Sequence, residues 1–131
     1  MKKKLFISCP MKGRTEENIR KSMAKMHKLA EIVFDQELDV IPSYIEDNPP
    51  KDSNAAVYFL GRSLQLLSQA DYYIGVDTFN FTGCDIENQV ARRYRIPSFK
   101  VNLSIAAPDI QEKMDLREAL DNSARGLVFE D

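Results

Sequence analysis

Short apolar segments alternate along this chain with longer segments in which apolar residues recur every three or four positions. Short apolar runs are typical of buried strands, and the longer spacing is typical of helices with one buried face. The expected strands cover residues 5–8, 38–41, 71–76 and 98–102, and the expected helices begin at Thr15, Asn54 and Asp85. This alternation predicts right-handed βαβ units and an α/β fold in which helices cover both faces of a parallel sheet.

The ends of two expected helices carry their own signals. Thr15 and Asn54 each precede a helical pattern, and their side chains are suited to accept a hydrogen bond from the first helical turn. The last quarter of the chain has a weaker pattern, which indicates a final helix over residues 110–120 and a short apolar tail at 127–129. No linker or repeat divides the chain, so residues 1–131 are expected to form one domain.

Composition narrows the class of protein. The net charge of −2 gives no electrostatic reason to expect a nucleic-acid partner. The apolar stretch at residues 5–9 is too short for a signal peptide or a membrane span, so we expect a cytoplasmic protein with no membrane partner. Cys9 and Cys84 lack metal-ligand spacing and are expected to be small buried thiols, and the single histidine, His27, lies in a helical pattern. A zinc site or a histidine-dependent triad is therefore not expected.

One acidic residue follows the third expected strand in a position suited to chemistry. The strand at residues 72–76 is followed by a loop that closes on Gly83, and Glu87 is expected in the first helical turn. This geometry places Glu87 at the carboxyl edge of the sheet, where open α/β sheets bind their ligands. The helix dipole would keep its carboxylate ionised, so it could act as a nucleophile. Alternatively, Asp85 and Glu87 only favour the start of the helix.

The loop from Ser8 to Arg14 joins the first expected strand to the first expected helix. Its position brings the unpaired N–H groups of a helix N-terminus to the same sheet edge, where they could bind an anion. Lys12 and Arg14 add positive charge, and Gly13 lets the backbone approach a ligand. The segment is neither a Walker A motif nor GxGxxG, and a solvated turn is the alternative.

The order of three motifs resembles the nucleoside 2-deoxyribosyltransferase-like superfamily, which includes deoxynucleoside 5′-monophosphate N-glycosidases. The motifs are the segment 6–13, a helix that ends just before Asp71, and the pair Gly83 and Glu87. The resemblance covers residues 4–103, most of the chain. It implies a flavodoxin-like three-layer sandwich with a parallel sheet of four to five strands, in which the first four have the order 2-1-3-4. It also implies chemistry at the bond between a sugar and a base.

The resemblance assigns roles to several residues. Glu87 would attack the anomeric carbon and form a glycosyl-enzyme intermediate, as in retaining glycosidases. Lys12 would bind a 5′-phosphate, and Ser8, Cys9 and Pro10 would line the sugar. The remaining candidates for substrate contact are Phe6, Met11, Gly13, Arg14, Ser63, Asp77, Gly83 and Asp85. No metal or organic cofactor is implied, because a carboxylate nucleophile and a polarised leaving base suffice.

Two positions depart from the pattern of the superfamily. Phe6 stands where relatives often carry a tyrosine, so a phenol that could position the nucleophile is missing. Ser63, eight residues before Asp71, stands where relatives usually carry an aspartate that binds the sugar and handles the leaving base. Candidate replacement acids are Glu46, Asp47 and Asp85, and the neighbouring Arg62 could instead serve an anionic ligand.

The leading hypothesis is a nucleoside or nucleotide N-glycosyltransferase or N-glycosidase with Glu87 as nucleophile. The second is a non-catalytic nucleotide-binding protein of the same fold, which Ser63 favours. A third is a module that binds a protein partner. The expected ligand is a small nucleoside or nucleotide. The resemblance also implies a homodimer or a higher homo-oligomer, for which the apolar tail at 127–129 is a candidate contact.

Overall fold

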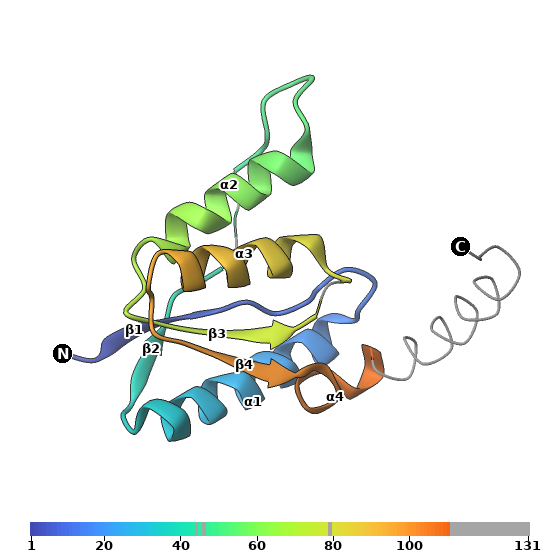
Figure 1. Ribbon diagram of the computed structural model, residues 1–131. Helices are drawn as coiled ribbons and strands as arrows, with labels where there is room; N and C mark the ends of the chain where they lie inside the picture. The colour runs from blue at the N-terminus through green and yellow to red at the C-terminus, as the bar shows by residue number, and fades with distance from the viewer. Residues whose placement is uncertain (44, 46, 79, 111–131) are drawn as a thin grey trace, which may run out of the picture.

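The computed structural model describes residues 1–43, 45, 47–78 and 80–110 (Figure 1). Strands and helices alternate in the order β1 (Lys3–Ile7), α1 (Glu16–Phe34), β2 (Leu38–Val40), α2 (Ala55–Leu67), β3 (Tyr72–Asp77), α3 (Thr82–Arg93), β4 (Ser98–Asn102) and α4 (Leu103–Ala106). The four strands in this part of the chain form one parallel sheet with the order β2-β1-β3-β4. The predicted flavodoxin-like α/β fold and its strand order are therefore confirmed.

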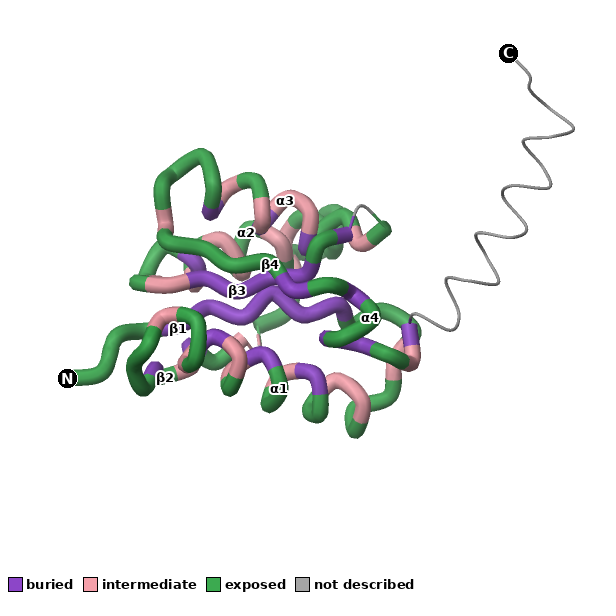
Figure 2. The backbone as a smooth tube through the Cα atoms, turned by 60° about the horizontal axis from the view of Figure 1, so that its bottom comes forward, coloured by how far each residue is buried: buried purple, intermediate pink, exposed green. Residues whose placement is uncertain are grey.

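The sheet lies between two layers of helices, with α2 and α3 above it and α1 below it in Figure 1. Successive strand residues point to opposite faces of a sheet, so β1 divides its side chains between the layers. Leu5 and Ile7 pack in the core on the α1 side, whereas Phe6 and Tyr73 pack under α2 and α3. Figure 2 shows the buried parts of the central strands β1 and β3 as a band between partly exposed helices, whereas the edge strand β4 is mostly exposed.

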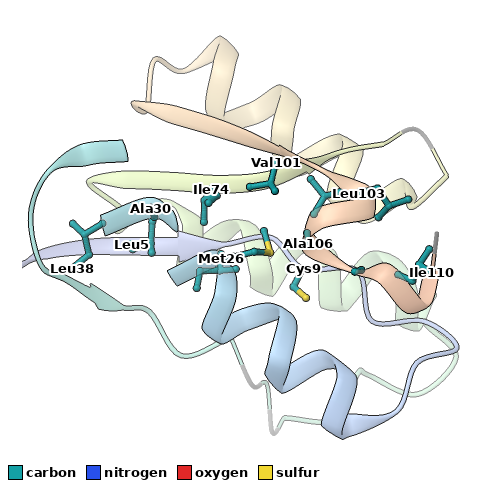
Figure 3. Close-up of a cluster of buried hydrophobic side chains, with 13 residues drawn as sticks. Leu5, Cys9, Met26, Ala30, Leu38, Ile74, Val101, Leu103, Ala106 and Ile110 are labelled. Atoms are coloured by element: carbon teal, nitrogen blue, oxygen red, sulfur yellow. The ribbon is translucent and has the colours of Figure 1, made fainter. Parts of the chain in front are cut away.

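The larger core cluster joins α1 and α4 to one face of the sheet (Figure 3). Met26 and Ala30, four residues apart on α1, are fully buried against it. Met26 and Ala30 thus lie on the helix face that packs on the sheet, as their helical spacing in the sequence predicted. The residues labelled in this cluster are Leu5, Cys9, Met26, Ala30, Leu38, Ile74, Val101, Leu103, Ala106 and Ile110.

Both predicted helix caps are confirmed. The Thr15 hydroxyl accepts a hydrogen bond from the Asn18 N–H at 3.1 Å, and the Asn54 amide oxygen accepts one from the Val57 N–H at 3.1 Å. Each contact satisfies one N–H group that has no partner inside its helix, a contribution of about 1 kcal/mol. In the described part of the chain, no helix combines the length and the apolar character that a membrane span requires.

Two boundaries differ from the sequence expectation. The third helix starts at Thr82 instead of Asp85, so Gly83 lies inside its first turn and Glu87 lies in its second turn. The preceding Phe81 makes no side-chain cap, so the sequence carries no signal for this start. The short helix α4 was also not expected. The expected final helix lies almost wholly, and the apolar tail entirely, outside the described residues.

Candidate active site

Three side chains from separate elements meet at the carboxyl edge of the sheet. Ser8 directly follows β1, Ser63 lies on α2, and Glu87 lies on α3. The Ser8 hydroxyl donates to Oε1 of Glu87 at 2.6 Å, and the Ser63 hydroxyl donates to Oε2 at 2.5 Å. Each carboxylate oxygen therefore accepts one hydroxyl hydrogen bond, which fixes the orientation of the carboxylate.

The local sequence explains why these groups converge. Ser8 continues the alternation of β1 and falls on the same side as Phe6, and its N–H donates to the Ile74 carbonyl at 2.9 Å. On α3, Glu87 belongs to the buried stripe that also holds Cys84 and Ala91, at spacings of three and four residues. Side chains alternate along a strand and recur every 3.6 residues along a helix. The hydroxyl of Ser8 and the carboxylate of Glu87 therefore face each other.

Glu87 is only 8 % exposed, and no ion pair joins it to a cation among the described residues. Burial raises the pKa of its carboxyl group above the usual value, and the hydrogen bonds from Ser63 and Ser8 oppose that rise. The expected help from the helix dipole is small, since Glu87 lies in the second turn and the dipole effect fades beyond the first. The two serine hydroxyls replace it as the groups that favour the charged form.

A second polar network lies beside the carboxylate. The Tyr73 hydroxyl donates to the Asn88 amide oxygen, and the Asn88 amide nitrogen donates to the Val76 carbonyl at 2.8 Å. Burial raises the pKa of Tyr73, and it raises the pKa of the Cys84 thiol to about 12. The polar groups of Tyr73, Cys84 and Asn88 beside Glu87 are therefore uncharged at neutral pH.

The loop after β1 is found at the same end of the sheet as the start of α3 (Figure 1), as expected for two segments that follow parallel strands. Met11 and Lys12 are exposed, and Gly13 has a φ of 75°, a conformation that side-chain-bearing residues rarely adopt. The exposed Lys12 ammonium is thus carried on a tight turn that glycine permits.

Arg14 points into the protein, and its side chain is 1 % exposed. Its guanidinium donates to both carboxylate oxygens of Asp109, at 3.0 and 2.8 Å, and to the hydroxyl of Ser22 at 2.7 Å. It also donates to the Pro10 carbonyl at 2.9 Å. Arg14 is therefore a clasp between the loop and the segment after α4, and this bidentate pairing leaves it little capacity for a ligand anion.

The other predicted site residues either make contacts with different partners or are exposed. Phe6 stacks on Tyr73 with ring centroids 5.9 Å apart, and Cys9 packs in the core on the α1 side. Asp77 and Gly83 are exposed, and Asp85 accepts a hydrogen bond from Gln89 at 3.2 Å. The structure thus unites Ser8, Ser63 and Glu87, with the loop of Lys12 at the same sheet edge.

The proposed replacement acids and Arg62 also have defined positions, except Glu46, which lies outside the described residues. Asp47 forms an ion pair with Arg62 at 2.8 Å and accepts a hydrogen bond from the Tyr58 hydroxyl at 2.6 Å. The side chains of both partners of this ion pair are exposed to solvent. Asp47 and Arg62 are therefore engaged with each other at the surface of α2.

Sequence reasoning missed Asn88, Tyr73 and Asp109 as supporting residues. A signal existed for Asn88, which is a polar residue beside the buried stripe of α3. No signal existed for Asp109, because its partner Arg14 is 95 residues away in the chain. The described residues contain no group of three or more histidine, cysteine, aspartate or glutamate side chains that could hold a metal ion.

Comparison with protein-family models, with curated proteins and with solved structures finds no match to this chain.

Proposed function

We propose that the protein cleaves the N-glycosidic bond of a nucleoside or nucleotide, by hydrolysis or by transfer of the sugar, with Glu87 as the nucleophile. The observation that carries this proposal is the buried Glu87 carboxylate, each oxygen of which accepts one serine hydroxyl hydrogen bond. A carboxylate has about four lone-pair positions, so two hydrogen bonds leave lone pairs available for attack. The resemblance of the sequence motifs supports the same chemistry.

The reaction would proceed in two steps. One oxygen of Glu87 bonds to the anomeric carbon as the bond to the base breaks, and water or a second base then attacks the resulting ester. Ser8 and Ser63 hold the carboxylate in place during both steps, because they come from different elements and donate to different oxygens. Such preorganisation lowers the cost of orienting the nucleophile at the moment of reaction.

Lys12 is the proposed contact for a 5′-phosphate. Its ammonium is exposed on the turn before α1, at the sheet edge that also carries Ser8. A point charge on a flexible stem is suited to an anion of variable position. Arg14 is not proposed to bind the phosphate, because its guanidinium holds the loop that carries Lys12 in place.

A second candidate function is nucleotide binding without catalysis. Ser63 favours it, because an aliphatic hydroxyl is too weak an acid to protonate a leaving base at neutral pH. In this case Glu87 would bind a sugar hydroxyl and not attack the anomeric carbon.

Base release from a panel of nucleosides and 5′-monophosphates distinguishes the two candidates. Glu87→Gln keeps the shape of the side chain but removes the attacking anion, so release should fall by several orders of magnitude. Glu17→Gln makes the same chemical change at an exposed site on α1 and should leave release unchanged. A ligand-dependent rise in melting temperature without base release would instead favour binding alone.

A further inference from the structure

The groups around Glu87 are poor proton donors at neutral pH. Among the described residues, the polar side chains that contact Glu87 or belong to the adjoining network are Ser8, Ser63, Tyr73, Cys84 and Asn88. They are hydroxyls, a phenol, a thiol and an amide, and burial raises the pKa values of both Tyr73 and Cys84. An efficient general acid has a pKa near the working pH, so none of these groups is suited to protonating a departing base.

Apart from Glu87, whose carboxylate is the proposed nucleophile, the carboxyl groups near this edge of the sheet do not fill that role among the described residues. A carboxyl group that donates a proton at neutral pH is normally held in an apolar pocket. Asp77 is exposed and Asp85 is hydrogen-bonded to Gln89. Asp47 is paired with Arg62 at the surface, and Asp109 is paired with Arg14. A base that needs a proton to leave would therefore find no such donor on these elements.

When the Glu87 carboxyl group is ionised, no cation in the described part of the chain forms an ion pair with it. The two arginines nearest in sequence to Ser8 and Ser63 are Arg14 and Arg62, and each forms an ion pair with an aspartate. A buried carboxylate without a counter-ion is costly, and a cationic ligand beside it recovers part of that cost. Among the described residues, the lack of a suitable acid and the lack of a counter-ion are separate observations, and both favour a ligand that carries a positive charge.

We propose that the substrates are N-glycosides whose base already carries a positive charge, such as pyridinium nucleosides or nucleosides of N7-alkylated purines. This inference rests on the proposed function and narrows its substrate class. A base of this kind leaves as a neutral molecule and needs no proton from the protein.

The step balances without an added acid or cofactor. An oxygen of Glu87 forms a bond to the anomeric carbon, and the carbon–nitrogen bond breaks with its electron pair moving to the ring nitrogen. That electron pair cancels the positive charge of the base. Water then attacks the anomeric carbon, releases the carboxylate and yields the free sugar and one proton to solvent. Ser8 and Ser63 donate to the carboxylate before the first step and after the second.

Guanosine and 7-methylguanosine are matched probes, because they differ by one methyl group and by the positive charge. We would measure kcat/KM for base release from both with the full-length protein, and the uncatalysed rates at the same pH. An enzyme without an acid should keep at least the uncatalysed rate ratio of the two compounds. A general acid would speed release of guanine by roughly 10²–10⁴-fold and compress the ratio accordingly.

Nicotinamide riboside tests the pH dependence, since the charge of its pyridinium does not titrate. Its kcat/KM should rise with pH through the ionisation of Glu87 and then stay level, whereas a falling limb would reveal an acid in the protein. A compressed rate ratio or a falling limb overturns the inference and leaves the proposed function intact. Failure to release any base from either class of compound overturns both.

Binding gives a measurement that does not depend on turnover. Carbocyclic analogues of the two purine nucleosides resist cleavage, and their Kd values can be compared by calorimetry. Glu87→Gln should weaken binding of the cationic analogue about tenfold more than binding of the neutral one, because a charge-assisted contact is lost. Equal losses for the two analogues would show that Glu87 does not act as the counter-charge.

Discussion

Gly75 and Asn88 lie in direct apposition between β3 and α3, and a Cβ atom on Gly75 would come 2.2 Å from the amide oxygen of Asn88. It would also lie 2.6 Å from the hydroxyl oxygen of Tyr73. The hydrogen bond between Tyr73 and Asn88 therefore occupies the space that a side chain at residue 75 would need. The polar network beside Glu87 therefore requires a glycine at this position of the central strand.

Gly75→Ala should lower the free energy of unfolding by about 1–3 kcal/mol, the usual cost of overpacking a filled site. Gly61→Ala is the matched control, because a Cβ there meets nothing within 4 Å on α2. Alanine is the better helix former by up to about 1 kcal/mol, so the control should be stabilised. Urea denaturation of both variants measures the difference. Equal effects of the two substitutions would contradict the packing argument.

The burial of Glu87 predicts a pH-dependent stability. Its pKa is raised in the folded state, so above the ordinary value of 4.5 the folded chain holds more of this proton than the unfolded chain does. The contribution of Glu87 to stability is thus present below pH 4.5 and is lost as pH rises through the folded pKa. Glu87→Gln lacks this dependence, so its stability relative to the wild type should increase between pH 4 and pH 7.

Denaturation of both proteins at several pH values measures this effect. Other carboxyl groups titrate in both proteins and largely cancel in the comparison. A constant difference between the two proteins across this range would mean that the pKa of Glu87 is the same in the folded and unfolded chains.

Arg14→Ala should destabilise the protein strongly. It leaves Asp109, whose side chain is 24 % exposed, without the partner that contacts both of its oxygens. Removing one partner of a buried ion pair costs about 3–5 kcal/mol, and the partial exposure of Asp109 favours the lower end. Arg20→Ala breaks an ion pair whose two side chains are each 77 % exposed and should change stability little. The melting temperature of Arg14→Ala should therefore be much lower than that of Arg20→Ala. Equal melting temperatures would show that the contacts of Arg14 do not stabilise the protein.

Lys12→Ala tests the proposed 5′-phosphate site. The substitution should weaken binding of a 5′-monophosphate about tenfold, by loss of a charge-assisted contact, and leave the matching nucleoside almost unaffected. Lys28→Ala removes an exposed charge from α1 and serves as the control for net charge. Titration of both ligands against the three proteins measures the effect. Losses of equal size for nucleoside and monophosphate would show that Lys12 only supports the loop.

The fold could be predicted because its signals are local. Each signal depends on a few neighbouring residues. Examples are the apolar strand segments at 5–8 and 71–76 and the helix caps at Thr15 and Asn54. The start of α3 could not be predicted, since Phe81 provides no side-chain cap.

The candidate site was predictable only in part, for a similar reason. The position of Glu87 after β3 and that of Ser8 after β1 follow from the topology of a parallel sheet. The contact between Ser63 and Glu87 does not follow from the topology, because the rotation of α2 about its axis decides which of its residues faces Glu87. The inward turn of Arg14 is likewise set by Asp109, at the far end of the described chain.

The hydrogen bond between Ser8 and Glu87 joins residues 79 positions apart, and it crosses between the elements that follow β1 and β3. Contacts of such long sequence separation carry a large loop-closure cost and tend to form late in folding. A nascent chain that has emerged only as far as β2 can close neither this contact nor the β1–β3 ladder. During refolding, recovery of this contact should therefore coincide with assembly of the sheet, so the Glu87 carboxylate would be held in place only in molecules that have completed their folding.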